Sequence, residues 1–87
     1  MTVSDSEIRG KLRDFISNNF LIGKSTAPPA DGDSFLESGL IDSTGVLEVV
    51  GFVQDTWEFD ISDEDMLPEN LDSIDNLTAY VLRRLAR

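Results

Sequence analysis

The chain has 87 residues, of which 40% are hydrophobic and 28% charged, and its 17 acidic and seven basic residues give a formal net charge of −10. This length predicts a single domain over residues 1–87 that can bury a core of its own. Because the sequence contains neither cysteine nor histidine, it excludes disulfide scaffolds, zinc fingers, cysteine nucleophiles and serine–histidine triads.

The first predicted helix runs from about Asp5 to Phe20. Ser4 lies three residues before Glu7, which is the spacing of a capping box that satisfies the free N–H groups of a helix start. Apolar residues then recur at intervals of three and four, the period of one helix face. The prolines and glycines between Gly23 and Asp33 predict a long loop after this helix.

A short apolar stretch follows the loop, over residues 34–41. It is interrupted by Gly39, and we expect it to pack on the core through Phe35, Leu36 and Leu40. The prediction for this stretch is therefore a packed segment rather than a main helix.

The second main helix is predicted to start after Asp42, a good N-cap residue. The residues expected to face the core have helical spacing: Val46, Val49, Val50, Val53 and Trp57. Gly45 and Gly51 are unfavourable within a helix, each by up to about 1 kcal/mol relative to alanine, unless another part of the chain packs closely there.

Two further helices are predicted near the C-terminus. A short one starts in the segment from Ser62 to Asp65 and ends before Pro68, and a last one is capped by Asp72 or Ser73. The inward residues of the last helix are expected to be Ile74, Leu77, Tyr80, Val81 and Leu85. The basic residues Arg83, Arg84 and Arg87 lie in its last turns, where cations stabilise the helix dipole. The predicted fold is all-α, a small antiparallel four-helix bundle of three main helices and one short helix with a long first loop.

Negative charge fills the middle of the sequence. Fourteen acidic residues and no basic residue lie between Lys24 and Arg83. This distribution disfavours binding to nucleic acid or to anionic membranes and favours basic protein partners. A solvated acidic surface that only maintains solubility is the other interpretation. No apolar run is long enough for a membrane span and no signal-peptide pattern is present, so we expect a cytoplasmic protein without membrane insertion.

No metal site and no catalytic residue is predicted. Candidate calcium loops that begin at Asp31, Asp60 or Asp63 each place an apolar residue at a required ligand position. Ser43 stands out instead, because it follows the Asp42 cap and its hydroxyl is expected to be exposed. A phosphate ester on Ser43 would lie at the positive end of the helix dipole. A helix-start serine without any role is the alternative.

The sequence resembles the acyl carrier protein family in three segments: Asp33–Thr44, Glu48–Val50 and Trp57–Asp65. The family pattern is an acidic loop, an Asp-Ser pair that opens an acidic helix, and a Phe-x-x-x-Ile-x-Asp-like segment. The resemblance implies that a phosphopantetheinyl transferase attaches 4′-phosphopantetheine from coenzyme A to Ser43, and that Asp42 helps to present this serine. The reactive thiol then belongs to the cofactor, so the chain itself is not an enzyme.

The resemblance also implies partners and a docking face. An adenylating ligase or acyltransferase would load the arm, and a downstream synthase or transferase would receive the acyl or aminoacyl group from a monomeric carrier. The residues expected to meet partners are Glu37, Thr44, Leu47, Glu48, Gly51, Asp55, Asp63, Glu64 and Asp65. The residues considered for an acyl cavity are Val50, Val53, Trp57, Ile61 and Met66, for which core packing is the alternative role.

Three positions depart from the family pattern. Thr44 stands where leucine is usual, and Gly45 and Gln54 replace acidic residues. The Gly-Leu-Ile-Asp-Ser-x-Gly run at residues 39–45 resembles that of discrete, free-standing carriers, and we expect a role in polyketide or mixed peptide–polyketide biosynthesis. The alternatives are a D-alanyl carrier for cell-envelope modification and a non-catalytic acidic interaction module with an unmodified Ser43.

Overall fold

The computed structural model describes residues 3–21 and 29–86. Within them it contains five α-helices and one 3-10 helix and no strand, so the predicted all-α class is confirmed. The elements in chain order are α1 (Asp5–Phe20), α2 (Phe35–Ser38), α3 (Ser43–Trp57), η1 (Asp63–Asp65), α4 (Pro68–Leu71) and α5 (Ile74–Leu85). Much of the predicted loop from Gly23 to Asp33 lies outside the described residues, as does Arg87. Every helix in the described ranges is too short or too polar to pass through a lipid bilayer.

Side-chain caps fix the starts of the three long helices. The Ser4 hydroxyl accepts a hydrogen bond from the Glu7 N–H (3.2 Å), and the Asp42 carboxylate accepts one from the Gly45 N–H (2.7 Å). Ser73 caps α5 by the same geometry. Of the two predicted caps, Asp72 and Ser73, the N-cap is therefore Ser73. Each cap satisfies one of the N–H groups that a helix start leaves unpaired.

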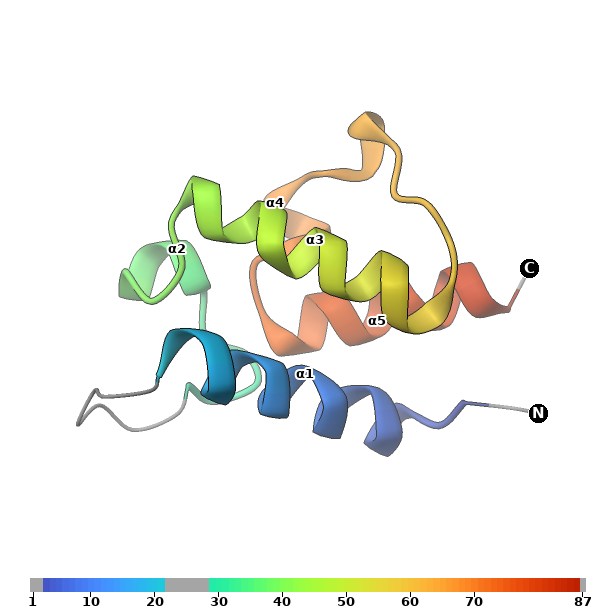
Figure 1. Cartoon of the computed structure of the whole chain (residues 1–87), viewed down its shortest axis with the longest axis horizontal. Helices are drawn as coiled ribbons and strands as arrows, with labels where there is room; N and C mark the ends of the chain where they lie inside the picture. The colour runs from blue at the N-terminus through green and yellow to red at the C-terminus, as the bar shows by residue number, and fades with distance from the viewer. Residues whose placement is uncertain (1–2, 22–28, 87) are drawn as a thin grey trace.

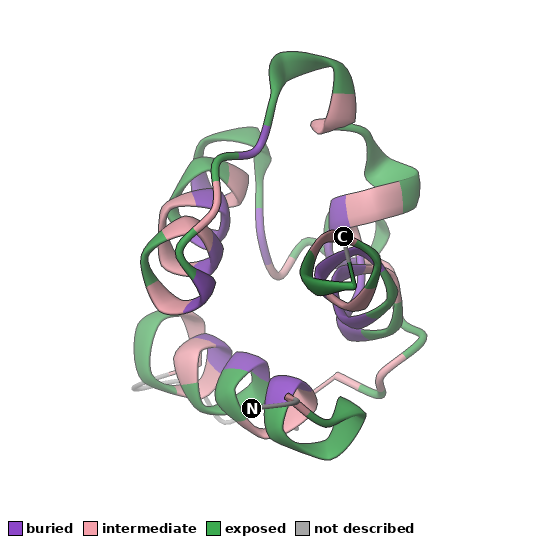
Figure 2. Cartoon of the chain, turned by 90° about the vertical axis from the view of Figure 1, so that its right-hand side faces the viewer, coloured by how far each residue is buried: buried purple, intermediate pink, exposed green. Residues whose placement is uncertain are grey.

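The long helices enclose one core. α1 runs in the opposite direction to α3 and α5, and the buried faces of all three helices point toward a shared interior (Figures 1 and 2). Residues that are fully buried come from each of them, for example Ile8, Val53 and Val81. The remaining core members are Leu12, Ile16, Phe35, Ile41, Val49, Val50, Trp57, Ile61, Leu71, Ile74, Leu77 and Tyr80.

Three residues that were predicted to face the core are less buried than expected. Leu36 and Leu85 are 43% and 38% exposed, and Val46 is only half-buried. α2 has a single turn, in which Phe35 is the buried residue. Ile41, which follows this helix, is also buried, whereas Leu36 points away from the core. α2 ends at Gly39, whose φ of 76° is a left-handed conformation that glycine adopts without strain.

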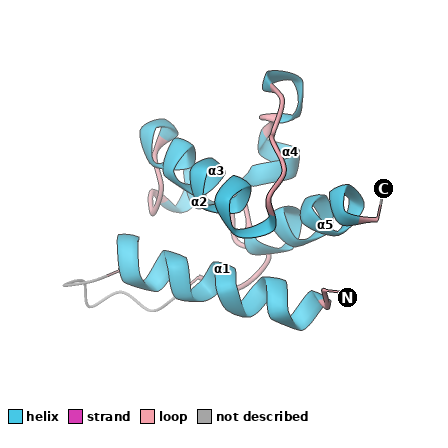
Figure 3. Ribbon diagram, turned by 45° about the vertical axis from the view of Figure 1, so that its right-hand side comes forward, coloured by secondary structure: helices cyan, strands magenta, loops and turns pink. Residues whose placement is uncertain are grey.

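The segment between α3 and α5 is more broken than predicted. The predicted short helix is a single 3-10 turn, η1, and a further turn, α4, begins at Pro68. Proline is favoured at this position because the first helical turn leaves its N–H groups unpaired in any case. In Figure 3 the chain around η1 stands away from the three long helices, whereas α4 lies beside α5 and contributes the buried Leu71 to the core.

An ion-pair network joins the two ends of the described chain. Asp31 accepts hydrogen bonds from Arg9 Nη1 (2.8 Å) and from Arg13 Nε (3.0 Å), and Arg9 also contacts Asp5 and Asp75. The Asp31 carbonyl accepts a further bond from the Asp75 N–H (2.8 Å). The hydrogen bonds from Arg13, and then those from Arg9, lower the pKa of Asp31, although partial desolvation opposes them. The network therefore fastens the residues before α2 to both α1 and the start of α5.

We expect Asp31→Asn to lower the free energy of unfolding by about 1 kcal/mol at neutral pH, since exposed or half-exposed ion pairs contribute up to about that amount. In a domain of this size the melting temperature would fall by about 4–8 °C. The contribution is present above the ordinary aspartate pKa of about 3.9 and is lost as pH falls through the lowered folded value. Thermal melts at pH 7 and at pH 2 measure it.

Asp14→Asn is the matched control, because Asp14 is exposed on α1 and the substitution changes the net charge equally. Equal melting temperatures for the two variants at pH 7 would show that the network does not stabilise the fold.

Candidate functional site

Ser43 is the first residue of α3 and is exposed. The neighbouring Asp42 is also exposed, but its carboxylate is committed to the Gly45 N–H. Within the described residues no hydrogen bond holds the Ser43 hydroxyl. This hydroxyl is therefore accessible at the positive end of a 15-residue helix.

The start of α3 rests directly on two apolar side chains. A Cβ atom at Gly45 would lie 2.9 Å from Ile41 Cγ2 and 3.1 Å from Phe20 Cε1. Only a residue without a side chain fits here without a shift of its neighbours. Gly45 therefore has a packing role, and it sets how closely α3 approaches the end of α1.

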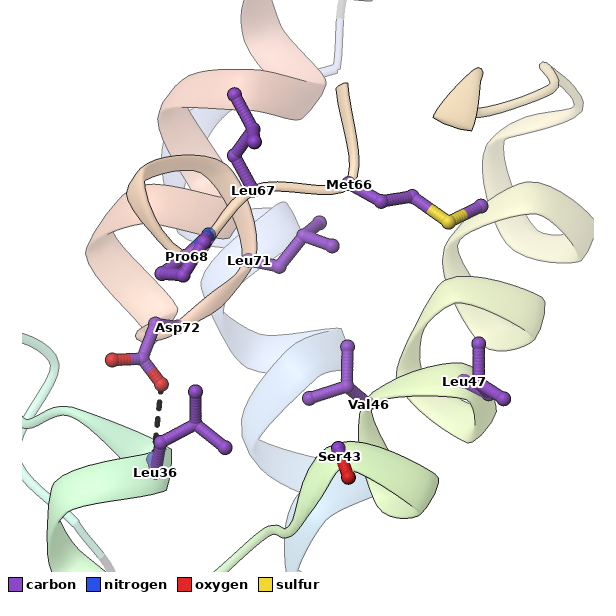
Figure 4. Close-up of a pocket in the computed structure, with 9 residues that line it drawn as sticks. All are labelled: Leu36, Ser43, Val46, Leu47, Met66, Leu67, Pro68, Leu71 and Asp72. Atoms are coloured by element: carbon purple, nitrogen blue, oxygen red, sulfur yellow. Dashed lines mark hydrogen bonds between the residues drawn. The ribbon is translucent and has the colours of Figure 1, made fainter. Parts of the chain in front are cut away.

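An apolar groove of about 270 Å³ begins beside Ser43. Its lining comes from α2, from the first turns of α3 and from the segment around α4: Leu36, Ser43, Val46, Leu47, Met66, Leu67, Pro68, Leu71 and Asp72. Figure 4 shows Val46 and Leu47 on α3 facing Met66 and Leu71 across the groove, with Ser43 at one end. Leu36, Leu47 and Leu67 are 43%, 62% and 42% exposed, so they present apolar surface at its rim.

Asp72 ties the two sides of one groove end together. Its carboxylate accepts hydrogen bonds from the Ser34 hydroxyl and from the Leu36 N–H (2.9 Å), and its carbonyl accepts one from the Phe35 N–H (2.8 Å). α2 is thereby attached to the junction between α4 and α5. Sequence reasoning considered Asp72 only as a helix cap, because a pairing between positions 34 and 72 leaves no local pattern.

Four of the five residues considered for an acyl cavity lie elsewhere. Met66 lines the groove, whereas Val50, Val53, Trp57 and Ile61 are buried in the core. Val50, Val53 and Trp57 lie on the core-facing side of α3, whereas Val46 and Leu47 on the same helix line the groove, and Ile61 is buried after the end of α3. The core-packing interpretation is correct for the four buried residues.

Most of the predicted partner-facing residues are exposed. Thr44, Glu48, Gly51 and Asp55 follow one another at spacings of four, three and four, which places them along one face of α3. Gly51 is half-buried, and the others on this face are exposed. Further exposed members of the predicted set are Glu37, Leu47, Asp63 and Glu64.

Asp65 differs from the other predicted partner-facing residues in its contacts. It is half-buried and accepts a hydrogen bond from the Tyr80 hydroxyl (2.8 Å), with Arg84 Nη1 3.8 Å away. Its carboxylate is therefore engaged with α5 within the fold.

Charge is segregated between the helices. Arg9 and Arg13 on α1 and Arg84 on α5 are all occupied by ion pairs within the fold. In residues 3–21 and 29–86, by contrast, none of the acidic side chains of α3 takes part in an ion pair. The acidic side chains of α3 therefore keep their negative charge uncompensated by an ion pair within the described residues.

Comparison of the sequence with protein-family models found no matching family, and comparison with curated proteins found no matching protein.

The close approach at Gly45 gives a sharp prediction. We expect Gly45→Ala to lower the free energy of unfolding by about 1–3 kcal/mol, the usual cost of an extra methyl group in a packed site. Gly51→Ala is the matched control on the same helix, since its Cβ would meet no atom within 4 Å. It should raise stability by up to about 1 kcal/mol through helix propensity. Urea unfolding of both variants would reveal the opposite signs, and a stabilising Gly45→Ala would contradict the packing argument.

Proposed function

We propose that this chain is a carrier protein that holds an acyl or aminoacyl group on a 4′-phosphopantetheine arm esterified to Ser43. The observation that supports this most is an exposed hydroxyl at the start of α3 that opens directly onto an apolar groove. Three long helices and short turns before the last one also fit the small four-helix bundle of the acyl carrier protein family.

The residues around Ser43 fit such an arm. A phosphodiester on this serine would lie next to the N–H groups of the first turn of α3, of which the Asp42 cap engages that of Gly45. From Ser43 the apolar groove continues between α3 and α4 toward Met66, without a charged side chain other than Asp72 in its lining. A flexible chain attached at Ser43 could therefore bury apolar atoms in the groove.

The attachment places few demands on this chain. The Ser43 oxygen would form a new bond to the phosphorus of coenzyme A that carries the pantetheine, and adenosine 3′,5′-bisphosphate would leave. The serine proton must pass to a base of the transferase, because the chain has no histidine and Asp42 is engaged as a helix cap. When attached, the arm supplies the thiol on which cargo is held as a thioester.

The acidic face of α3 would then be the docking surface for basic patches on the partner enzymes. The partners in this proposal are the transferase, an adenylating ligase or acyltransferase, and a downstream synthase or transferase, all in the cytoplasm. Polyketide or mixed peptide–polyketide biosynthesis is the proposed setting. The departures at Thr44 and Gly45 from the fatty-acid carrier pattern support this choice. A D-alanyl carrier would use the same serine, groove and acidic face.

The proposal predicts one covalent modification. After incubation with coenzyme A, magnesium and a broad-specificity phosphopantetheinyl transferase, intact-protein mass spectrometry should show one phosphopantetheine added per chain, mapped to Ser43. Ser43→Ala should abolish the addition and leave the helical content unchanged, since the hydroxyl is exposed.

Ser62→Ala is the matched control, because Ser62 is also an exposed serine next to the start of a helical turn and makes no side-chain cap bond. It should be modified like the wild type. An unmodified wild type, with a known carrier modified in the same mixture, would favour the acidic interaction module instead.

The docking surface predicts a change in association kinetics. Glu48→Gln with Asp55→Asn should slow association with the transferase by roughly two- to tenfold at low ionic strength, and should flatten the salt dependence of the rate. The control pair is Glu7→Gln with Asp14→Asn, which are also seven residues apart but lie on α1. Stopped-flow measurements at several salt concentrations compare them. Equal rates for the two double variants would exclude a specific role for the α3 face.

A further inference from the structure

One wall of the groove has almost no apolar anchorage. We call residues 62–70, which lie between buried Ile61 and buried Leu71, the groove wall; none of them is buried. Met66 is half-buried and Leu67 is 42% exposed, although both line the groove. The opposite wall is α3, a continuous helix whose other face is packed in the core. Apolar packing therefore fixes the α3 side of the groove more firmly than the groove wall, of which only Met66 packs against the core, so the position of the wall also depends on polar contacts.

A polar cluster supplies such a contact at Asp65. The Tyr80 hydroxyl donates a hydrogen bond to Asp65 Oδ2 (2.8 Å) and accepts one from Arg84 Nη1 (2.9 Å). The Arg84 guanidinium also lies over the Phe59 ring, 4.6 Å from its centroid. Tyr80 is only 2% exposed, so water competes weakly for its hydroxyl. Burial, and then the bond to Asp65, raise the pKa of Tyr80, which keeps the phenol protonated and able to donate.

The backbone of the groove wall is fastened through the same residue. The Asp65 carbonyl accepts hydrogen bonds from the Leu67 N–H (2.8 Å) and from Asn70 Nδ2 (2.8 Å). Asn70 in turn accepts a bond from Arg83 Nη2 (2.9 Å). The Asp65 side chain thus connects the groove wall to α5, and the Asp65 carbonyl bonds to other residues of the groove wall. Met66, which lines the groove, is the next residue in the chain.

We propose that the Asp65–Tyr80–Arg84 cluster is a latch that fixes the groove wall against α5 and thereby sets how long a chain attached at Ser43 the groove accepts. This inference rests on the proposed function, because the attached chain stands for the cargo. Asp65, Tyr80 and Arg84 are positioning residues, since Asp65 belongs to the groove wall, Tyr80 and Arg84 lie on α5, and none of them lines the groove. With the latch open, Met66 and Leu67 can move away from α3 and admit a longer chain.

The absence of cysteine from the sequence makes a direct test possible without any transferase. Ser43→Cys provides a single attachment point, to which straight alkyl chains of increasing length are joined as mixed disulfides by alkyl methanethiosulfonates. The melting temperature should rise with chain length until the groove is filled and should then level off. The Tyr80→Phe substitution, added to Ser43→Cys, removes one hydroxyl and keeps the ring. In this variant the melting temperature should level off at a chain about two methylene groups longer, because the wider groove buries more of the chain and each further buried methylene adds stability.

Two more variants and a second readout complete the test. Asp65→Asn should act like Tyr80→Phe, whereas Glu64→Gln on the same 3-10 turn should behave like the parent, since Glu64 is exposed. In the protein without any alkyl chain, Tyr80→Phe should accelerate hydrogen exchange at the Leu67 N–H, which is bonded to the Asp65 carbonyl.

The outcomes separate the inference from the proposed function. Unchanged exchange at Leu67 would overturn the latch, and faster exchange with an unchanged levelling length would overturn its control of chain length. Melting temperatures that do not depend on chain length in the parent would overturn the groove as the site of the chain. The transferase assay on Ser43 tests the carrier function independently of all three.

Discussion

The close approach of Gly45 to Ile41 and Phe20 determines how near the start of α3, which Asp42 caps, lies to the end of α1. Since α3 approaches so closely there, the Asp42 cap stands at the surface, Ser43 faces solvent, and the face bearing Val46 and Leu47 turns toward α4. A larger residue would push the helix start outward and displace both the serine and one wall of the groove. The site thus depends on a missing side chain in the core rather than on any polar group within it.

The structure uses its charges in two different ways. Arginine side chains on α1 and α5 close the fold by pairing with Asp31, Asp75 and Asp65, which are far from them in sequence. The carboxylates of α3 form no such ion pairs within the described residues, so the negative charge of the protein is not neutralised evenly. The net negative charge of the chain disfavours the compact state through self-repulsion. Arginine side chains offset part of this repulsion near α1 and α5, whereas the carboxylates of α3 have no such partner in the part of the chain that the structure describes.

Sequence analysis predicted the elements whose signals are local. The caps Ser4 and Asp42 are predictable because a cap bonds a group only two or three residues away, and the bounds of α1 and the start of α3 are confirmed. Features made by distant residues were missed. The pairing of Ser34 with Asp72 and that of Asp65 with Tyr80 span 38 and 15 positions and leave no periodic pattern. The groove was not predicted for the same reason. Its lining comes from α2, α3 and the segment around α4, and most of its residues are apolar residues that could equally belong to the core.

The internal pairing of Arg9, Arg13 and Arg84 also gives the molecule an electric polarity. These arginines lie on α1 and α5, whereas α3 carries Glu48 and Asp55 and no basic residue, so positive and negative groups are unevenly distributed between the helices. Such a molecule experiences a torque as well as an attraction in the field of a positively charged surface. It would turn its α3 side forward during the approach, before any atoms touch, and so reduce the orientational search that limits the rate at which most proteins associate.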